Sequence, residues 1–289
     1  MWLGGGDPLI TGVMSNTSEL PAAGRPGLYP ADGLSTSNWL GLWTLYWREV
    51  RRFKKVYTQT IVAPVVTTLL FLAIFALALG RAVETVGGVP FMEFLAPGLI
   101  MMAIAQNAFA NTSSSIVIAK VQGNIVDTLM PPLNAHELTF GHAMGGATRG
   151  VVVGVVVAVA MSPFVTLHVH NVVFIVYHAV MASLMLSLLG VAGGIWSEKF
   201  DHIAAVTNFL VTPLSFLSGT FYSIARLPEA AQAIAYVNPF FYMIDGFRYG
   251  FIGHADAPPL LGMAVLAAVN AALWALCTWM FRTGYKLKA

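Results

Sequence analysis

Apolar residues recur along this chain in runs of roughly twenty residues, from Ile61 to Phe281. A helix needs ~20 such residues to cross the ~30 Å hydrocarbon core of a bilayer. Lipid offers no partners to backbone groups, so each run is expected to be helical. The predicted spans cover residues 61 to 79, 94 to 118, 140 to 161, 171 to 194, 203 to 219 and 260 to 281. The pattern predicts an all-α membrane protein with six transmembrane helices.

An amphipathic pattern precedes the first span, over residues 38 to 57. Its apolar positions follow helical spacing, and its cations fall largely elsewhere on the helix surface. The apolar positions are Trp39, Leu42, Trp43, Tyr46, Val50, Phe53 and Tyr57, and the cations are Arg48, Arg51, Arg52 and Lys55. This predicts an interfacial helix with cations toward water and anionic lipid. The alternative is a helix that merely extends the first span.

The longest connection on the cytoplasmic side covers residues 119 to 138. Pro131 and Pro132 end any helix there. Before them, apolar residues form a short stripe made of Ile118, Val121, Ile125 and Leu129. The stripe predicts a short helix that projects toward the cytosol and offers a docking surface. The alternative is a plain connection between two spans.

On the outer side, residues 220 to 253 contain two helical units of about ten and thirteen residues, too short to span. Pro228 suits the first turn of one unit, and Asn238 and Pro239 separate it from the next. Aromatic side chains are frequent here, as in the headgroup zone of membranes. The segment predicts a helical hairpin that dips into the outer leaflet.

Composition and charge support this topology. Charged residues make up 10% of the 289 and hydrophobic ones 57%, whereas soluble domains carry about 25% charged residues. Lysine and arginine gather on one side of the predicted spans, which places both termini in the cytoplasm. That side holds Arg48, Arg51, Arg52, Lys54, Lys55, Lys120, Lys199, Arg282, Lys286 and Lys288, against Arg81, Arg226 and Arg248 opposite. Residues 1 to 37, rich in small and polar types, are predicted to be a disordered cytoplasmic tail.

Motifs for catalysis are missing from the sequence. It contains no G-x-x-x-x-G-K-[ST] segment, so ATP would have to bind a partner chain. His168 and His170 could hold a metal in an outer loop, but two exposed histidines are more often solvated. The sequence predicts no metal, no cofactor in this chain, no enzyme activity and no nucleic-acid partner.

Four polar residues within the spans are candidates for a translocation path: Gln106, Asn107, Asn111 and Arg149. A charge at the bilayer centre costs ~2.5 to 3.5 kcal/mol, so Arg149 either snorkels to the cytoplasmic surface or faces a cavity. In a cavity it could meet an anionic headgroup. The three amide side chains could line the same path or only pack between helices.

Several motifs occur in an order similar to that of permease subunits of type-2 ABC exporters, particularly the YadH and NodJ branches. The closing ones are LSGTFY at 217–222, NPxxY at 238–242 and GFRYG at 246–250. Upstream are FLAPGL at 94–99 and KxQxNI at 120–125. The resemblance covers residues 38 to 285.

The resemblance implies a dimer of six-span subunits, each docking one ATPase subunit that binds ATP and magnesium. The segment 38 to 57 would be a connecting helix and 119 to 138 would contain a coupling helix. ATPase contacts would come from Lys120, Gln122, Asn124, Ile125 and Asp127. The outer hairpin would form a gate with Asn238, Pro239, Tyr242, Asp245, Gly246, Phe247 and Arg248. Relatives commonly have two acidic residues where Val126 and Asp127 stand, and a small neutral residue where Asp245 stands.

The spacing of Asp245 and Arg248 would let them pair on one helix face. The alternative is a snorkelling arginine beside an unrelated aspartate.

The sequence therefore predicts a transmembrane domain over residues 38 to 289 that acts as the permease of an ATP-driven exporter. It would sit in a bacterial inner membrane among lipids and move an amphipathic or lipid-linked substrate outward. An ATP-independent channel or secondary carrier is the alternative. Secondary carriers commonly show inverted repeats, which this sequence lacks.

Overall fold

The computed structural model describes residues 38–80, 85, 86 and 88–287. The predicted tail of residues 1 to 37 lies outside the described residues. Within them the fold is helical, and six helical segments are long and apolar enough to cross a membrane. They are Thr58–Ala78, Phe91–Val121, Ala135–Met161, Val172–Trp196, Phe200–Leu217 and Pro259–Thr283. The six predicted spans are confirmed to within a few residues at their ends. One short antiparallel hairpin pairs β1 (Thr85–Val86) with β2 (Val89–Pro90).

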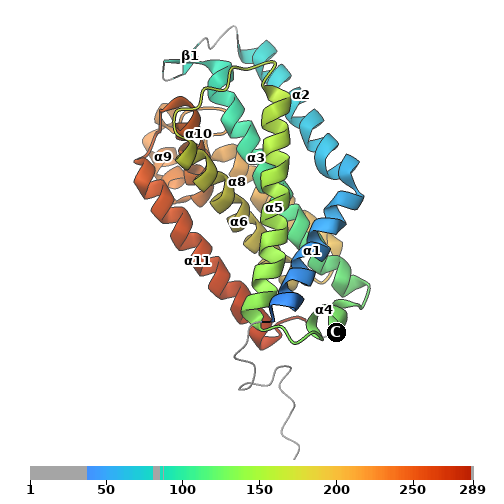
Figure 1. Ribbon diagram of the computed structural model, residues 1–289. Coiled ribbons are helices and arrows are strands. Elements are labelled where there is room, and N and C mark those ends of the chain that lie inside the picture. The colour runs from blue at the N-terminus through green and yellow to red at the C-terminus, as the bar shows by residue number, and fades with distance from the viewer. Residues whose placement is uncertain (1–37, 81–84, 87, 288–289) are drawn as a thin grey trace, which may run out of the picture. The chain divides into compact units, whose positions relative to one another are not determined.

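The second span, α3 (Phe91–Val121), is the central helix of the bundle (Figure 1). It packs against α5 (Ala135–Met161) and α6 (Val172–Trp196), and its side chains form much of the apolar core. Small residues let these helices approach closely, as is common between membrane helices. A Cβ at Gly146 would lie 2.6 Å from the Thr112 methyl group, and one at Gly190 would lie 2.6 Å from the Phe109 carbonyl oxygen.

The first and fifth spans share an irregularity that the sequence analysis did not predict. A π-helical turn, η1 (Thr58–Val62), precedes α2 (Ala63–Leu79), and a second, η2 (Thr207–Val211), joins α7 (Phe200–Val206) to α8 (Thr212–Leu217). Each turn is followed closely by a proline, Pro64 or Pro213. Proline lacks the N–H that an α-helix would use there, and π turns often mark functional sites.

The cytoplasmic end of the bundle carries α1 (Trp39–Lys55) and α4 (Ile125–Leu129), near the C-terminal end of α11 (Pro259–Thr283) (Figure 1). The Asn38 side chain caps α1 by accepting from the Gly41 N–H at 2.9 Å. The residues of the predicted apolar stripe do not lie on one helix, because Val121 ends α3 and Ile125 begins α4. Gly123 has φ +73°, a conformation that glycine adopts easily, and it separates the end of α3 from α4.

The opposite end carries α9 (Glu229–Val237) and α10 (Pro239–Ile252), near the β1–β2 hairpin (Figure 1). A 3-10 turn, η3 (Ile224–Arg226), precedes them. Asn238 caps α10 by accepting from the Phe240 N–H at 3.0 Å, and Gly253 ends it at φ +71°. The two short helical units predicted from sequence are confirmed, with Asn238 as the boundary between them.

Candidate functional site

A cluster of charged and polar side chains surrounds Glu49 at the cytoplasmic end. Its side chain is only 1% exposed although it lies on α1, a helix rich in cations. We call this set the inner cluster: Arg48, Glu49, Arg52, Asn111, Ser115 and His142. Oε1 of Glu49 accepts from the Ser115 hydroxyl at 2.8 Å, and Oε2 lies 3.2 Å from Nη2 of Arg52. The carboxylate therefore ties α1 to α3.

Two arginines and a histidine extend the contacts of the inner cluster to α4 and α5. Arg52 donates to Oδ1 of Asn111 at 3.0 Å and also to the Asn111 backbone carbonyl in α3. Arg48 lies 3.6 Å from Oε1 of Glu49 and donates to the Thr128 hydroxyl of α4 at 3.1 Å. Nδ1 of His142, from α5, lies 3.6 Å from the same carboxylate oxygen. Through these contacts α4 is linked to α1, α3 and α5.

The protein makes room for Glu49 and favours its ionised form. A Cβ at Gly145 of α5 would lie 2.5 Å from the Cβ of Glu49, so glycine permits this close packing. Burial alone would raise the pKa of Glu49. Its neighbours His142, Arg52, Ser115 and Arg48 outweigh burial, and the pKa lies below its ordinary 4.5. Glu49 was not among the residues predicted from sequence, where its signal is a lone acid among the cations of residues 48 to 55.

The predicted ATPase-contact residues divide into two groups. Gln122, Asn124 and Asp127 are exposed on and beside α4. Ile125 is buried, at 6% exposure, and Lys120 donates to the backbone carbonyls of Ile195 and Ser197 at the end of α6. Lys120 thus satisfies carbonyl groups that the end of a helix leaves open. Of the five predicted contact residues, only those of the first group lie on the exposed surface of this segment.

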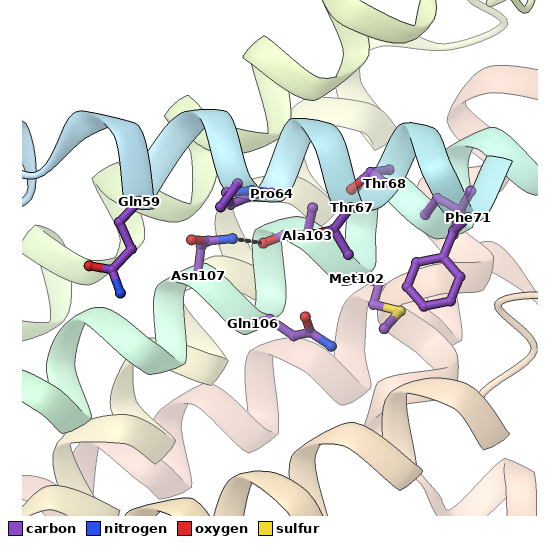
Figure 2. A pocket seen from close by; sticks show the side chains of 11 residues that line it. Gln59, Pro64, Thr67, Thr68, Phe71, Met102, Ala103, Gln106 and Asn107 are labelled. Atoms are coloured by element: carbon purple, nitrogen blue, oxygen red, sulfur yellow. Dashed lines mark hydrogen bonds between the residues drawn. The ribbon is translucent and has the colours of Figure 1, made fainter. Parts of the chain in front are cut away.

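The four predicted polar residues of the spans also fall into two groups in the structure. Gln106 and Asn107 line a cavity of about 230 Å³ beside the first span (Figure 2). Arg149 donates to Oδ1 of Asn107 at 3.0 Å, so its guanidinium lies against the second span. Asn111 instead belongs to the inner cluster. The structure therefore joins Asn107 and Arg149, and separates Asn111 from the cavity.

At the outer end, Arg248 is 2% exposed and lies among backbone carbonyl groups. It donates to Gly219 at 2.6 Å, to Thr220 at 3.4 Å and, through Nε, to Phe94 at 3.3 Å. Its guanidinium carbon lies 3.9 Å from the centre of the Phe94 ring, a cation–π contact. Arg248 thus joins the LSGTFY segment, α10 and the start of α3.

Asp245 binds a different part of the backbone. Its carboxylate oxygens accept from the N–H groups of Asp256 at 2.9 Å and Ala257 at 3.0 Å. Asp256 in turn accepts from the Ser223 hydroxyl at 2.7 Å and the Ile224 N–H at 2.9 Å. We call Asp245, Arg248, Asp256 and the backbone groups they bind the outer cluster. Within the described chain, Asp245 and Arg248 each bind the backbone instead of forming the salt bridge that their spacing allowed.

The remaining predicted gate residues position α10. Asn238 donates to the Ser218 hydroxyl at 2.8 Å, and the Tyr242 hydroxyl donates to the Tyr236 carbonyl at 2.9 Å. Phe247 is part of the apolar core. Gly246 lets α10 approach α6, because a Cβ there would lie 2.0 Å from Nε2 of His178.

Gly98, in the FLAPGL motif, has a similar role. A Cβ at this position would lie 2.6 Å from the Thr220 carbonyl oxygen and 3.2 Å from Nη2 of Arg248. The sequence marked this motif only by resemblance. The structure shows that its glycine leaves the space in which Arg248 meets the LSGTFY segment.

His168 and His170 have separate neighbours. Nδ1 of His168 lies 3.2 Å from Oε2 of Glu93, and the ring of His170 contacts Tyr249. In the described part of the chain, no group of three or more metal-ligating side chains gathers.

Comparisons with known proteins point to one family of transport proteins. The family model described as "ABC-2 type transporter" matches residues 41–252. The "Inner membrane transport permease YadH" of Escherichia coli K12 is 37% identical over 251 residues, covering 87% of this chain and 98% of the relative. "Nodulation protein J" of Rhizobium leguminosarum bv. viciae is 25% identical over 239 residues, covering 82% and 90%. The protein of that name from Rhizobium meliloti is 22% identical over 251 residues, covering 86% and 90%.

Proposed function

The chain belongs to the ABC-2 type transporter family, and we propose from this that it exports an amphipathic or lipid-linked substrate using ATP hydrolysed by a separate subunit. It is a multi-pass permease of the inner membrane, without its own nucleotide-binding site. Two copies of the permease would assemble with two ATPase subunits. Residues 38 to 289 form the transmembrane domain in this proposal.

One observation carries the proposed coupling to ATP. The exposed residues Gln122, Asn124 and Asp127 lie on and beside α4, and Thr128 on the buried side of α4 accepts from Arg48. A partner that pushed α4 would therefore act on the inner cluster. Because Glu49 and Arg52 bind α3 directly, movement of α4 would reach the central helix of the bundle. Lys120 and Ile125 would hold this segment in place.

Two placements relative to the membrane belong to the same proposal. The exposed aromatic residues Trp39 and Trp43 on α1 suit the headgroup zone, and its exposed cations suit water and anionic lipid. The helices α9 and α10 would form a re-entrant hairpin in the outer leaflet. Its gate would include Asn238, Pro239, Tyr242, Asp245, Gly246, Phe247 and Arg248.

The test uses the purified permease in proteoliposomes, with and without its ABC-type ATPase subunit. We expect no ATP hydrolysis by the permease alone and robust hydrolysis by the complex. Asp127→Lys should leave membrane insertion intact but lower transport at least tenfold, because a cation replaces an exposed carboxylate on α4. Asp201→Lys, an equivalent change on the same side of the membrane but outside α4, is the matched control.

Hydrolysis by the permease alone would contradict the assignment. Transport in the absence of any ATPase would favour the channel or carrier. Unchanged transport by Asp127→Lys would remove Asp127 from the coupling surface.

A further inference from the structure

The π-helical turns η1 and η2 share one seven-residue sequence pattern. Residues 58–64 read TQTIVAP and residues 207–213 read TNFLVTP. Both begin with threonine and an amide side chain, and both have valine in fifth and proline in seventh place. In each turn an N–H group binds the carbonyl five residues earlier, from Ala63 to Thr58 and from Thr212 to Thr207. The repeated pattern indicates that the sequence encodes the same irregularity in the first and fifth spans.

The two turns are the points at which these spans bend most easily. Helical bonds over five residues are rare and short-lived along a chain, and in the described part of the chain they form only these two turns. Pro64 and Pro213 lack the N–H group that would continue the bonding. Sharp bends of helices occur mainly at prolines and at π turns, and each of the two spans has both.

Beyond the turns, aromatic side chains join the first span to the end of the fifth. The Phe75 ring stacks on Phe221 with centroids 4.4 Å apart, and Phe216 of α8 stacks on Phe221 at 5.2 Å. Phe71 lies 6.3 Å from Phe216. The loop after α8 is also bound by Arg248 of the outer cluster. The segments that follow the two turns therefore form one unit, which consists of α2, α8 and Phe221.

Before the turns, the same spans have different attachments. The helix α7 has no buried residue, so little packing fixes its direction. The helix α1 is attached to the inner cluster through Glu49 and Arg52, and Arg48 binds Thr128 of α4. A movement of α4 would thus reach α1 directly, whereas α2 lies on the other side of η1.

We propose that η1 and η2 are paired hinges. During transport α1 and α7 tilt about them, while α2, α8 and Phe221 stay joined to one another. The proposal rests on the proposed export function and adds the positions at which the first and fifth spans bend.

The first test straightens one turn at a time. A π turn holds one residue more than an α turn, so one deletion restores a regular helix and preserves the register on both sides. Deletion of Phe209, which is 84% exposed, is combined with Pro213→Ala in the fifth span. Deletion of Val62, which is 48% exposed, is combined with Pro64→Ala in the first. With the ATPase subunit present, each straightened variant should transport at least tenfold more slowly than the native permease and still hydrolyse ATP.

Deletion of Leu70 is the matched control for folding. Leu70 is 57% exposed but lies in the regular part of α2, so its loss turns one side of the helix by about 100° relative to the other. This should move Phe71 and Phe75 out of register with Phe221 and lower the Tm by roughly 10 °C. The straightened first span should keep a Tm close to that of the native chain. Equal losses in the two variants would overturn the assignment of a spare residue to η1.

Spin labels on the permease without its ATPase test the hinges directly. Val173, at the outer start of α6, is the common reference position. Its partners are Leu40 and Ala205 before the turns and Leu77 and Leu217 after them, all of which are exposed. Labelled chains are diluted with unlabelled ones, so that each assembly carries one labelled copy. Double electron–electron resonance should give broad distance distributions for the positions before the turns and narrow ones for those after them.

Straightening should act on one hinge at a time. The variant of the first span should narrow only the distribution of Leu40, and the variant of the fifth span only that of Ala205. Native transport rates in both variants, or distributions that straightening leaves unchanged, would overturn the inference.

Failure of the export function gives a different pattern. Absent ATP-driven transport by the native permease, with distributions that straightening still narrows, would contradict export alone. Normal ATP-driven transport with distributions that straightening leaves unchanged would contradict this inference alone.

Discussion

The inner and outer clusters both bury charged side chains, but they satisfy them in different ways. In the inner cluster, Glu49 binds side chains of several separate helices. In the outer cluster, Arg248 donates to backbone carbonyl groups and Asp245 accepts from backbone N–H groups. Ion pairs between side chains can change partners when helices shift. Backbone partners cannot be exchanged without rebuilding the loops that carry them.

The difference assigns different tasks to the two ends. The inner cluster suits a joint that passes movement from α4 to α3, as the proposed coupling requires. The outer cluster is suited to stabilising one fixed arrangement of the LSGTFY segment, α10 and the start of the second span. Substitutions in the outer cluster should therefore affect stability most, and substitutions in the inner cluster should affect coupling most.

The largest effect is expected at Arg248. Replacing Arg248 with alanine leaves the carbonyl groups of Gly219 and Thr220 buried without this donor. Each such orphaned group costs about 1–3 kcal/mol, so a loss of roughly 2–6 kcal/mol is expected. Unfolding in detergent, followed by tryptophan fluorescence, measures the loss. An unfolding free energy equal to that of the native chain would contradict the claim that Arg248 stabilises the outer cluster.

A smaller loss is expected at Gly98. Gly98→Ala brings a Cβ to 2.6 Å from the Thr220 carbonyl oxygen, and overpacking of this kind typically costs about 1–3 kcal/mol. Gly193→Ala is the matched control, because its nearest contact would be an ordinary 3.7 Å to Ile203. The same unfolding assay compares the two variants. Equal stabilities would show that Gly98 is not needed for the close approach.

Double-mutant cycles sharpen the contrast between the clusters. Glu49→Gln and Arg52→Gln remove two partners of one ion pair, so their effects on unfolding should couple by at least about 0.5 kcal/mol. Asp245→Asn and Arg248→Gln alter groups with separate backbone partners, so their effects should add within about 0.5 kcal/mol. Strong coupling in the second cycle would instead support a direct interaction between Asp245 and Arg248, as their spacing suggested.

Sequence patterns predicted the six spans because burial in lipid leaves a long, regular apolar signal. They predicted the two outer helical units because Pro228, Asn238 and Pro239 mark where these units begin and end. They did not predict the break at Gly123, since apolar spacing alone continues through it. Neither did they reveal Glu49, whose partners come from helices distant in sequence. The spacing of Asp245 and Arg248 correctly placed both residues on one helix face. It carried no information on the loops whose backbone groups bind these side chains.

Sequence position also did not predict which polar residues of the spans line the cavity and which belong to the inner cluster. Asn107 and Asn111 are four residues apart on α3, which places them on the same side of the helix. Only the packing of α1 assigns Asn111 to the inner cluster, and only the packing of the first span places Asn107 in the cavity wall. Such assignments depend on contacts between helices, which apolar periodicity does not describe.

The central claim is that the inner cluster passes the ATP-driven movement of α4 to the membrane spans. A spin label at Leu260, a position 75% exposed at the outer start of α11, reports the distance between two copies of the permease. Double electron–electron resonance is measured with the ATPase subunit present, before and after ATP is trapped. We expect the distance to change in the native permease and in Asp245→Asn. In Glu49→Gln it should stay constant while ATP hydrolysis continues, and a native distance change in that variant would contradict the account.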